Sequence, residues 1–189
     1  MSTLPSSFTT ANVMKIHPGM SSDEILQLFG ANCQKKKLKL ILNGGESKIG
    51  IESTVIDLTG KPTILRPGII DLKKIYNVLK TRVGITQKNS KVISPGMLKK
   101  HYSPGIPIFL NQTTTNEMNA LITFGKKYKN KTNYFNLSKK SDLKEAASNL
   151  YKTLRKIKKL KFKKIYIVKI PNKGPGIAIN DRLKRAAKK

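Results

Sequence analysis

The stretch Ile49–Arg66 reads IGIESTVIDLTGKPTILR, and it decides the fold of the N-terminal half of the chain. Its first part, Ile49–Leu58, is rich in β-branched residues, which favour strands. Thr59-Gly60-Lys61-Pro62 has the composition of a turn, and Thr63–Arg66 returns as a second strand. Two strands joined by a tight turn predict an antiparallel hairpin.

Working outward from the hairpin, the sequence predicts a short helix at Ser21–Gly30 and a strand at Leu38–Leu42 before it. After it, Asp71 is expected to cap a helix that carries apolar residues at i, i+3, i+4 and i+7, namely Leu72, Ile75, Tyr76 and Leu79. Residues 84–105 then lose all periodicity and become rich in polar residues, glycine and proline. This composition is typical of a linker.

A second periodic region follows the linker. Short strands are predicted at Pro107–Leu110, Ala120–Phe124, Asn133–Leu137 and Ile165–Ile170. Ser141 is expected to cap a long helix whose apolar stripe runs from Leu143 to Ile157, and a closing helix is expected at Ile177–Ala187. Strands that alternate with helices predict an α/β unit with a largely parallel sheet.

Composition narrows the class of protein. The chain has 189 residues, 38% of them hydrophobic, which suffices for one medium or two small cores. No apolar run approaches the roughly 20 residues that span a bilayer, so we expect no membrane segment. A lone cysteine, Cys33, fits a reducing, cytoplasmic location, and with only two histidines, His17 and His101, we expect no zinc site built by the protein.

The charge is strongly basic and unevenly distributed. Net charge is +28, from 38 basic and 10 acidic residues. Residues 106–189 carry 22 − 4 = +18 of it, and residues 1–105 carry 16 − 6 = +10. Such an excess suits a polyanionic partner such as tRNA or double-stranded RNA. Since only five of the basic residues are arginine, the residue suited to bidentate phosphate recognition, a solvated lysine surface is the alternative.

Four stretches, in this order, resemble the YrdC-like L-threonylcarbamoyladenylate synthases that carry an extra C-terminal domain. They are Leu4-Pro5 through Thr10-Ala11-Asn12; Leu40–Gly45 with Gly50–Leu58 and Leu65-Arg66-Pro67-Gly68; Ser94-Pro95-Gly96-Met97 with His101-Tyr102-Ser103-Pro104; and Gly176–Leu183 with Ala186-Ala187. The hairpin and the linker are the specific parts of the match.

The resemblance implies a nucleotidyltransferase of tRNA modification. The family joins L-threonine, bicarbonate and ATP into threonylcarbamoyl-AMP and pyrophosphate, the intermediate for N6-threonylcarbamoyladenosine. The carbamate on the threonine nitrogen attacks the α-phosphate and pyrophosphate leaves, so positioning and Mg²⁺ on the phosphates are expected to supply most of the catalysis. No side chain is therefore assigned a covalent or acid–base role, and no protein-built metal site is expected.

The resemblance also assigns contacts. Ser53 and Thr10 match residues that touch threonine, while Asn12 and Arg66 match residues that touch the nucleotide. His101 and Tyr102 lie in a linker that, in the family, folds over the nucleotide. The first of these stretches departs from the family pattern, which has proline at the position of Thr9 and serine at that of Thr10.

The fold expected from the resemblance is the C-terminal part of a YrdC-like α/β domain (1–84), an active-site linker (85–105) and a small Rossmann-like α/β domain (106–189). In the family, a lysine- and arginine-containing stretch that binds the phosphates precedes the segment that Leu4–Asn12 resembles. No part of this chain aligns with that stretch, so the chain is expected to be N-terminally truncated and weak or inactive alone. Two alternatives remain open, a non-catalytic basic RNA-binding module and an inactive remnant.

Overall fold

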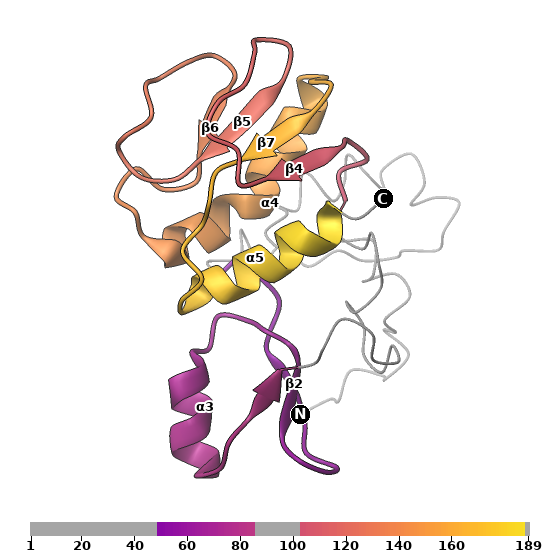
Figure 1. The fold of residues 1–189 in the computed structure, drawn as a ribbon, viewed down its shortest axis with the longest axis vertical. Helices are drawn as coiled ribbons and strands as arrows, with labels where there is room; N and C mark the ends of the chain where they lie inside the picture. The colour runs from indigo at the N-terminus through magenta and orange to yellow at the C-terminus, as the bar shows by residue number, and fades with distance from the viewer. Residues whose placement is uncertain (1–48, 86–102, 188–189) are drawn as a thin grey trace, which may run out of the picture. The chain divides into compact units, whose positions relative to one another are not determined.

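The computed structural model describes residues 49–85 and 103–187, all within the compact unit Ile49–Lys189 (Figure 1). The helix predicted at 21–30, the strand predicted at 38–42 and most of the linker lie outside the described residues. Two sheets are present in the described part, one of three strands and one of four.

The predicted hairpin is confirmed. Strand β1 (Val55–Asp57) pairs antiparallel with β2 (Thr63–Arg66), in the register Val55↔Arg66, Ile56↔Ile64 and Asp57↔Thr63. The register shifts between Val55 and Ile56, as it does at a β-bulge. The first strand is shorter than the β-rich stretch that predicted it, because only three of those residues have a ladder partner.

Strand β3 (Gly84–Ile85) completes this sheet by pairing in parallel with β2. The sequence prediction missed it and placed these residues at the start of the linker. A strand of two residues is too short to show a hydrophobic period. Its pairing with β2 includes a hydrogen bond from the Gly84 amide to the Pro62 carbonyl, at 2.9 Å.

Helix α3 (Leu72–Leu79) begins where predicted. The Asp71 carboxylate accepts from the Lys73 amide at 2.9 Å, which is an N-cap bond. The helix ends at Leu79, and the next residue, Lys80, caps it with a positive φ of 51° and an amide that donates to the Tyr76 carbonyl. Within the expected apolar stripe, Ile75 is buried, but the side chain of Tyr76 is 51% exposed.

The C-terminal sheet confirms the expected parallel α/β architecture. Its strands are β4 (Ile108–Leu110), β5 (Ala120–Thr123), β6 (Tyr134–Asn136) and β7 (Ile165–Ile167). They are all parallel in the order β4-β7-β5-β6, so the last strand inserts between the first two. All four carboxyl ends consequently meet at one edge of the sheet.

The C-terminal domain also contains two helices, α4 (Leu143–Lys159) and α5 (Pro175–Ala186), which pack against each other. The predicted stripe of α4 is its buried side. The shared core contains Leu121, Ile122, Leu137, Ala146, Ala147, Leu150, Leu154, Ile157, Ile165, Ile167, Ala178, Ile179 and Leu183. Hydrophobic burial of this kind is the main stabilising contribution to the domain.

The predicted cap of α4 was wrong by one residue. Asp142, rather than Ser141, is the N-cap, and its carboxylate accepts from the amides of Lys144 at 2.6 Å and Glu145 at 3.1 Å. Ser141 has a φ of 59°, the left-handed region in which an N-cap residue does not lie.

None of the helices in residues 49–85 and 103–187 is long and apolar enough to cross a membrane.

Candidate substrate site on the hairpin

The two residues that the sequence singled out on the hairpin are joined at its base. The Arg66 guanidinium donates from Nε to the backbone carbonyl of Ser53 at 3.2 Å. Ser53 is exposed and Arg66 is partly exposed. A guanidinium carries five N–H donors in a fixed fork, so this bond orients a group suited to phosphate or carboxylate oxygens.

The segment after β2 returns to the chain just before β1. The Gly68 amide donates to the Thr54 hydroxyl at 3.1 Å. A Cβ at Gly68 would collide with the backbone of Ser53 and Thr54, so only glycine permits this approach. The motifs Glu-Ser-Thr and Arg-Pro-Gly are therefore one local structure.

Helix α5 anchors both motifs through Arg182, which is 1% exposed. Its Nε donates to the Glu52 carboxylate at 3.0 Å, and its Nη1 donates to the Pro67 carbonyl at 2.9 Å. A single buried guanidinium thus holds the residue before Ser53 and the residue after Arg66. The chain positions the exposed Ser53 and the partly exposed Arg66 by fixing their neighbours.

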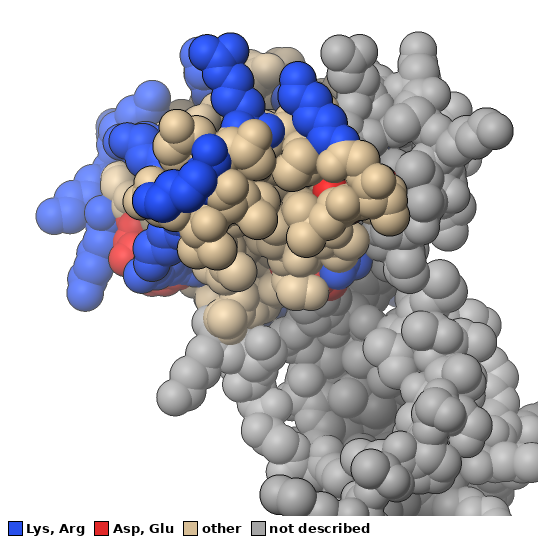
Figure 2. Space-filling model, turned by 90° about the horizontal axis from the view of Figure 1, so that it is seen from below, with Lys and Arg blue, Asp and Glu red and all other residues tan. Residues whose placement is uncertain are grey.

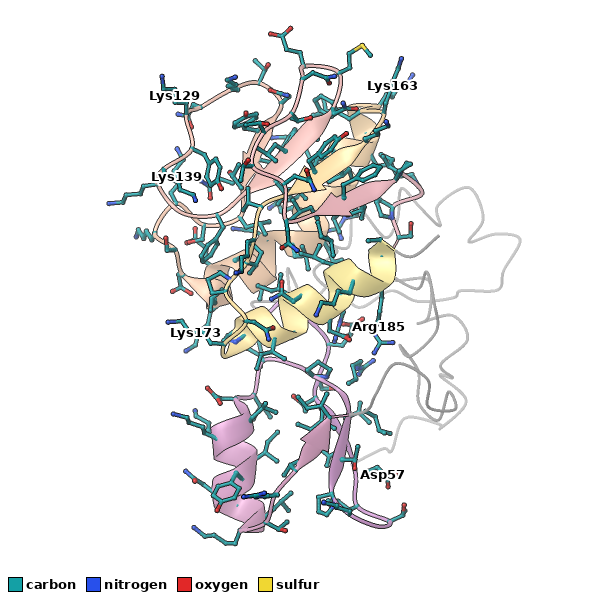
Figure 3. All side chains as sticks on the ribbon, in the orientation of Figure 1. Asp57, Lys129, Lys139, Lys163, Lys173 and Arg185 are labelled. Carbon is teal, nitrogen blue, oxygen red and sulfur yellow. The ribbon has the colours of Figure 1, made fainter. Side chains whose placement is uncertain are left out.

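The charge of Arg182 is balanced locally. Asp181 accepts from Arg182 Nη1 at 2.9 Å and from Arg185 Nε at 2.9 Å. With Glu52, the four residues form a network of two cations and two carboxylates. Neutrality is required here, because removing one partner of a buried ion pair leaves an uncompensated charge. Figure 3 labels Arg185 on α5.

Hydrogen bonds to the Asp57 carboxylate stabilise the turn of the hairpin. The Thr59 hydroxyl and amide both donate to the Asp57 carboxylate, at 2.7 and 2.9 Å. These bonds lower the pKa of Asp57 below its ordinary value, with the hydroxyl making the larger contribution. Asp57, labelled at the lower end of Figure 3, therefore fixes the geometry of the turn.

Residues 70–188, more than half of the chain, match the family model described as threonylcarbamoyl-AMP synthase, C-terminal domain. The chain belongs to this family.

Sequence similarity to curated synthases supports the same family. The chain is 31% identical over 166 residues to the threonylcarbamoyl-AMP synthase of Bacillus subtilis (strain 168), covering 78% of this chain and 48% of the relative. It is also 31% identical over 169 residues to that of Pyrococcus abyssi (strain GE5 / Orsay), covering 80% and 50%. The chain therefore spans about half the length of the curated relatives that it matches.

Solved structures give the same result. The crystal structure of P. abyssi Sua5 complexed with L-threonine matches with a TM-score of 0.72 and 27% identity, over 90% of this chain and 55% of that chain. A P. abyssi Sua5 variant in which an adjacent histidine and tyrosine are replaced by alanine matches with a TM-score of 0.70 and 25% identity, over 89% and 52%. The mixed α/β fold with a parallel sheet is thus shared with the synthases.

The other residues that the resemblance assigned, Thr10, Asn12, His101 and Tyr102, lie outside the described residues. Within residues 49–85 and 103–187, no group of three or more His, Cys, Asp or Glu side chains could hold a metal ion. Glu52, the carboxylate next to Ser53, is engaged by Arg182.

Sequence reasoning missed the roles of Glu52 and Arg182. Both lie within stretches that carry the resemblance to the synthases, but neither was assigned a function. The feature of the sequence that could have pointed to Arg182 is the scarcity of arginine. In a chain whose basic residues are mostly lysine, Arg66 and Arg182 each bond to a backbone carbonyl in the described structure.

Proposed function

We propose that this protein takes part in the synthesis of threonylcarbamoyl-AMP, from L-threonine, bicarbonate and ATP, for N6-threonylcarbamoyladenosine modification of tRNA. Membership of the synthase family supports the reaction. The threonine complex of the similar P. abyssi protein supports threonine as a substrate. The expected location is the cytoplasm.

The observation that carries the proposal is the bond between Arg66 Nε and the Ser53 carbonyl. It joins the side chain proposed to contact the nucleotide to the residue proposed to contact threonine. The reaction requires these two substrates to meet, because a carbamate oxygen attacks the α-phosphate and pyrophosphate departs. A direct hydrogen bond between the two residues supports the positioning that such a transfer needs.

In this proposal the Ser53 hydroxyl donates to an oxygen of threonine or of its carbamate, and Arg66 donates to phosphate oxygens. Thr10 adds a threonine contact, and Asn12, His101 and Tyr102 add nucleotide contacts. An adjacent His–Tyr pair was also the target of substitution in the P. abyssi variant, which supports a role for the pair here.

Mg²⁺ is proposed to accompany ATP. The described residues do not fit a dedicated site for the ion, because they contain no cluster of three metal-ligating side chains and Glu52 is paired with Arg182. Mg²⁺ commonly keeps several waters and binds through substrate phosphates. We therefore assign it no ligand among the described side chains and derive no step through it.

Thermal shift with ATP, MgCl₂ and L-threonine tests the proposal. We expect the melting temperature of the 189-residue chain to rise with the combined ligands, because binding to the folded state stabilises it. The rise should be reduced in Ser53→Ala and Arg66→Ala. It should persist in Arg82→Ala, which removes an exposed arginine from the same segment. Equal shifts in all four proteins would reject the assignment of the hairpin.

Product formation gives a second readout. Mass spectrometry should detect slow formation of threonylcarbamoyl-AMP only when threonine, bicarbonate and ATP are all present. An adduct that forms equally without bicarbonate would contradict the proposed chemistry.

RNA binding is the second candidate function, and the distribution of lysine favours it. Figure 2 shows Lys and Arg side chains projecting from the described surface, with only small acidic areas between them. Four lysines of the described residues lie over aromatic rings: Lys127 over Tyr128 at 5.1 Å, Lys131 over Tyr134 at 5.3 Å, Lys156 over Phe135 at 5.9 Å and Lys164 over Phe109 at 5.7 Å. A non-catalytic RNA-binding module predicts tight, steeply salt-dependent RNA binding and no stabilisation by ATP with threonine.

A further inference from the structure

A cavity of about 390 Å³ opens at the carboxyl edge of the C-terminal sheet. Three neighbouring strands contribute to its lining through the residues that follow them: Asn111 and Thr113 after β4, Phe124 through Tyr128 after β5, and Val168, Lys169 and Pro171 after β7. Ser141, just before α4, also lines the cavity. Ligands of open α/β sheets bind outside the carboxyl ends of the strands, and this volume lies in the range of ligand pockets.

A smaller cavity of about 220 Å³ extends the same edge toward β6. It shares Lys126 and Tyr128 with the first and adds Asn130, Asn136 and Lys139. The two cavities together follow the ends of all four strands. We call this combined feature the carboxyl-edge groove.

All the charged side chains that line the groove are positive. Four lysines line it, Lys126, Lys127, Lys139 and Lys169, and no acidic residue is among the lining residues. Figure 3 shows Lys129 and Lys139 on one side of the sheet, well away from Lys163, which precedes β7. A concave surface lined by a single sign of charge concentrates ligands of the opposite sign.

Backbone hydrogen bonds fix the start of the loop that lines the groove. Gly125 has a φ of 86°, and its amide donates to the Ser138 carbonyl at 2.9 Å. Its own carbonyl accepts from Asn136 Nδ2 at 2.8 Å. A Cβ at Gly125 would lie 2.9 Å from the Ser141 hydroxyl, and the positive φ would strain any other residue there. The loop that carries Lys126 and Lys127 thus starts from a fixed position.

The other residues that line the groove suit a ligand that has an organic ring as well as a negative charge. Phe124 and Tyr128 are partly buried and offer apolar surface, while Asn111 and Thr113 offer an amide and a hydroxyl. Aromatic side chains with a few polar groups are typical of sites that hold an organic ring beside a charged group. Lysine ammonium groups bind phosphate as point charges.

We propose that the carboxyl-edge groove binds a small nucleoside phosphate, with its phosphate on the lysines and its base against Phe124 and Tyr128. The site goes beyond the substrate contacts proposed on the hairpin, since its lining includes neither Ser53 nor Arg66. It gives the C-terminal domain a ligand of its own.

NMR titration of the ¹⁵N-labelled 189-residue chain with AMP tests the proposal, with adenosine and inorganic phosphate as further probes. We expect AMP to shift the amide resonances of Gly125, Tyr128 and Val168 at concentrations where adenosine does not. The double substitution Lys126→Ala with Lys169→Ala should weaken this binding about tenfold or more, the loss expected for charged hydrogen bonds. Lys158→Ala with Lys163→Ala removes the same charge from exposed positions outside the groove and should leave binding within about twofold.

Three results would overturn the proposal, and the first two concern AMP. One is the absence of AMP-dependent shifts at the groove, and the other is an equal loss of affinity in both double variants. Shifts produced only by a single-stranded RNA oligonucleotide would also overturn it and would assign the groove to RNA. Arg66→Ala separates this site from the hairpin, because it should leave the groove shifts intact whether or not the hairpin binds ATP.

Discussion

Arg182 on helix α5 donates to the carboxylate of Glu52, 130 residues earlier in the chain, at 3.0 Å. The same guanidinium bonds to the Pro67 carbonyl. One buried cation therefore links the hairpin to the C-terminal domain, beside the packing of Ile51 into the core of that domain. We conclude that the local geometry of Ser53 and Arg66 depends on α5.

Replacement of Glu52 by alanine should therefore destabilise the fold. The substitution leaves Arg182 buried with Asp181 as its remaining carboxylate partner, and breaking a buried pair costs about 3 kcal/mol of unfolding free energy. Urea denaturation measures the change. Glu117→Ala, which removes an exposed carboxylate, is the matched control and should change the free energy by less than about 0.5 kcal/mol. Equal stability of the two variants would show that the pair has no structural role.

Replacement of Gly68 by alanine should displace the Arg-Pro-Gly segment. Its Cβ would overlap the backbone at Thr54, and such overpacking costs about 1–3 kcal/mol. Gly60→Ala is a close control, because nothing lies within 4 Å of a Cβ there. Thermal denaturation should show a lower melting temperature only for Gly68→Ala. A similar fall in both variants would mean that the contact with Thr54 is not the cause.

Asp142, as the N-cap of α4, should be more sensitive than its neighbour. Asp142→Ala removes two capping bonds and should cost about 1 kcal/mol. Ser141→Gly should be neutral or stabilising, since glycine accepts the positive φ at that position without strain. Chemical denaturation of the two variants distinguishes the observed cap from the one expected from sequence. A larger loss for Ser141→Gly would reverse the assignment.

Thr59→Ala should raise the pKa of Asp57 toward its ordinary value, because the hydroxyl bond is the larger cause of the depression. A carboxylate with a depressed pKa stabilises the fold above its unfolded pKa. That contribution is lost as the pH falls through the folded pKa. NMR titration of the Asp57 carboxyl measures the shift directly. An unchanged midpoint in the variant would exclude the Thr59 hydroxyl as its cause.

The sequence predicted elements that have a strong period or a tight turn. The hairpin, the helix after Asp71 and the strands and helices of the parallel sheet are all present in the described part. It missed β3, which has two residues, and misplaced the cap of α4, because Ser141 and Asp142 are both good capping residues and only the backbone angle separates them.

The resemblance identified the hairpin motifs, yet the reason for their shape was not visible in the sequence. Glu52 and Arg182 are ordinary charged residues until the fold brings them together. The carboxyl-edge groove was equally hidden, because its lysines come from separate loops and resemble a solvated surface when read in order. Long-range contacts of this kind follow from topology rather than from local pattern.

The central claim is that the base of the hairpin binds threonine, and an NMR titration of the ¹⁵N-labelled 189-residue chain with L-threonine in the presence of ATP and MgCl₂ tests it most directly. We predict saturable shifts of the Ser53, Thr54, Arg66 and Gly68 amide resonances with L-threonine, much smaller shifts with D-threonine, and loss of both in Ser53→Ala. Shifts that are absent from these four residues, or equal for the two enantiomers, would contradict the account.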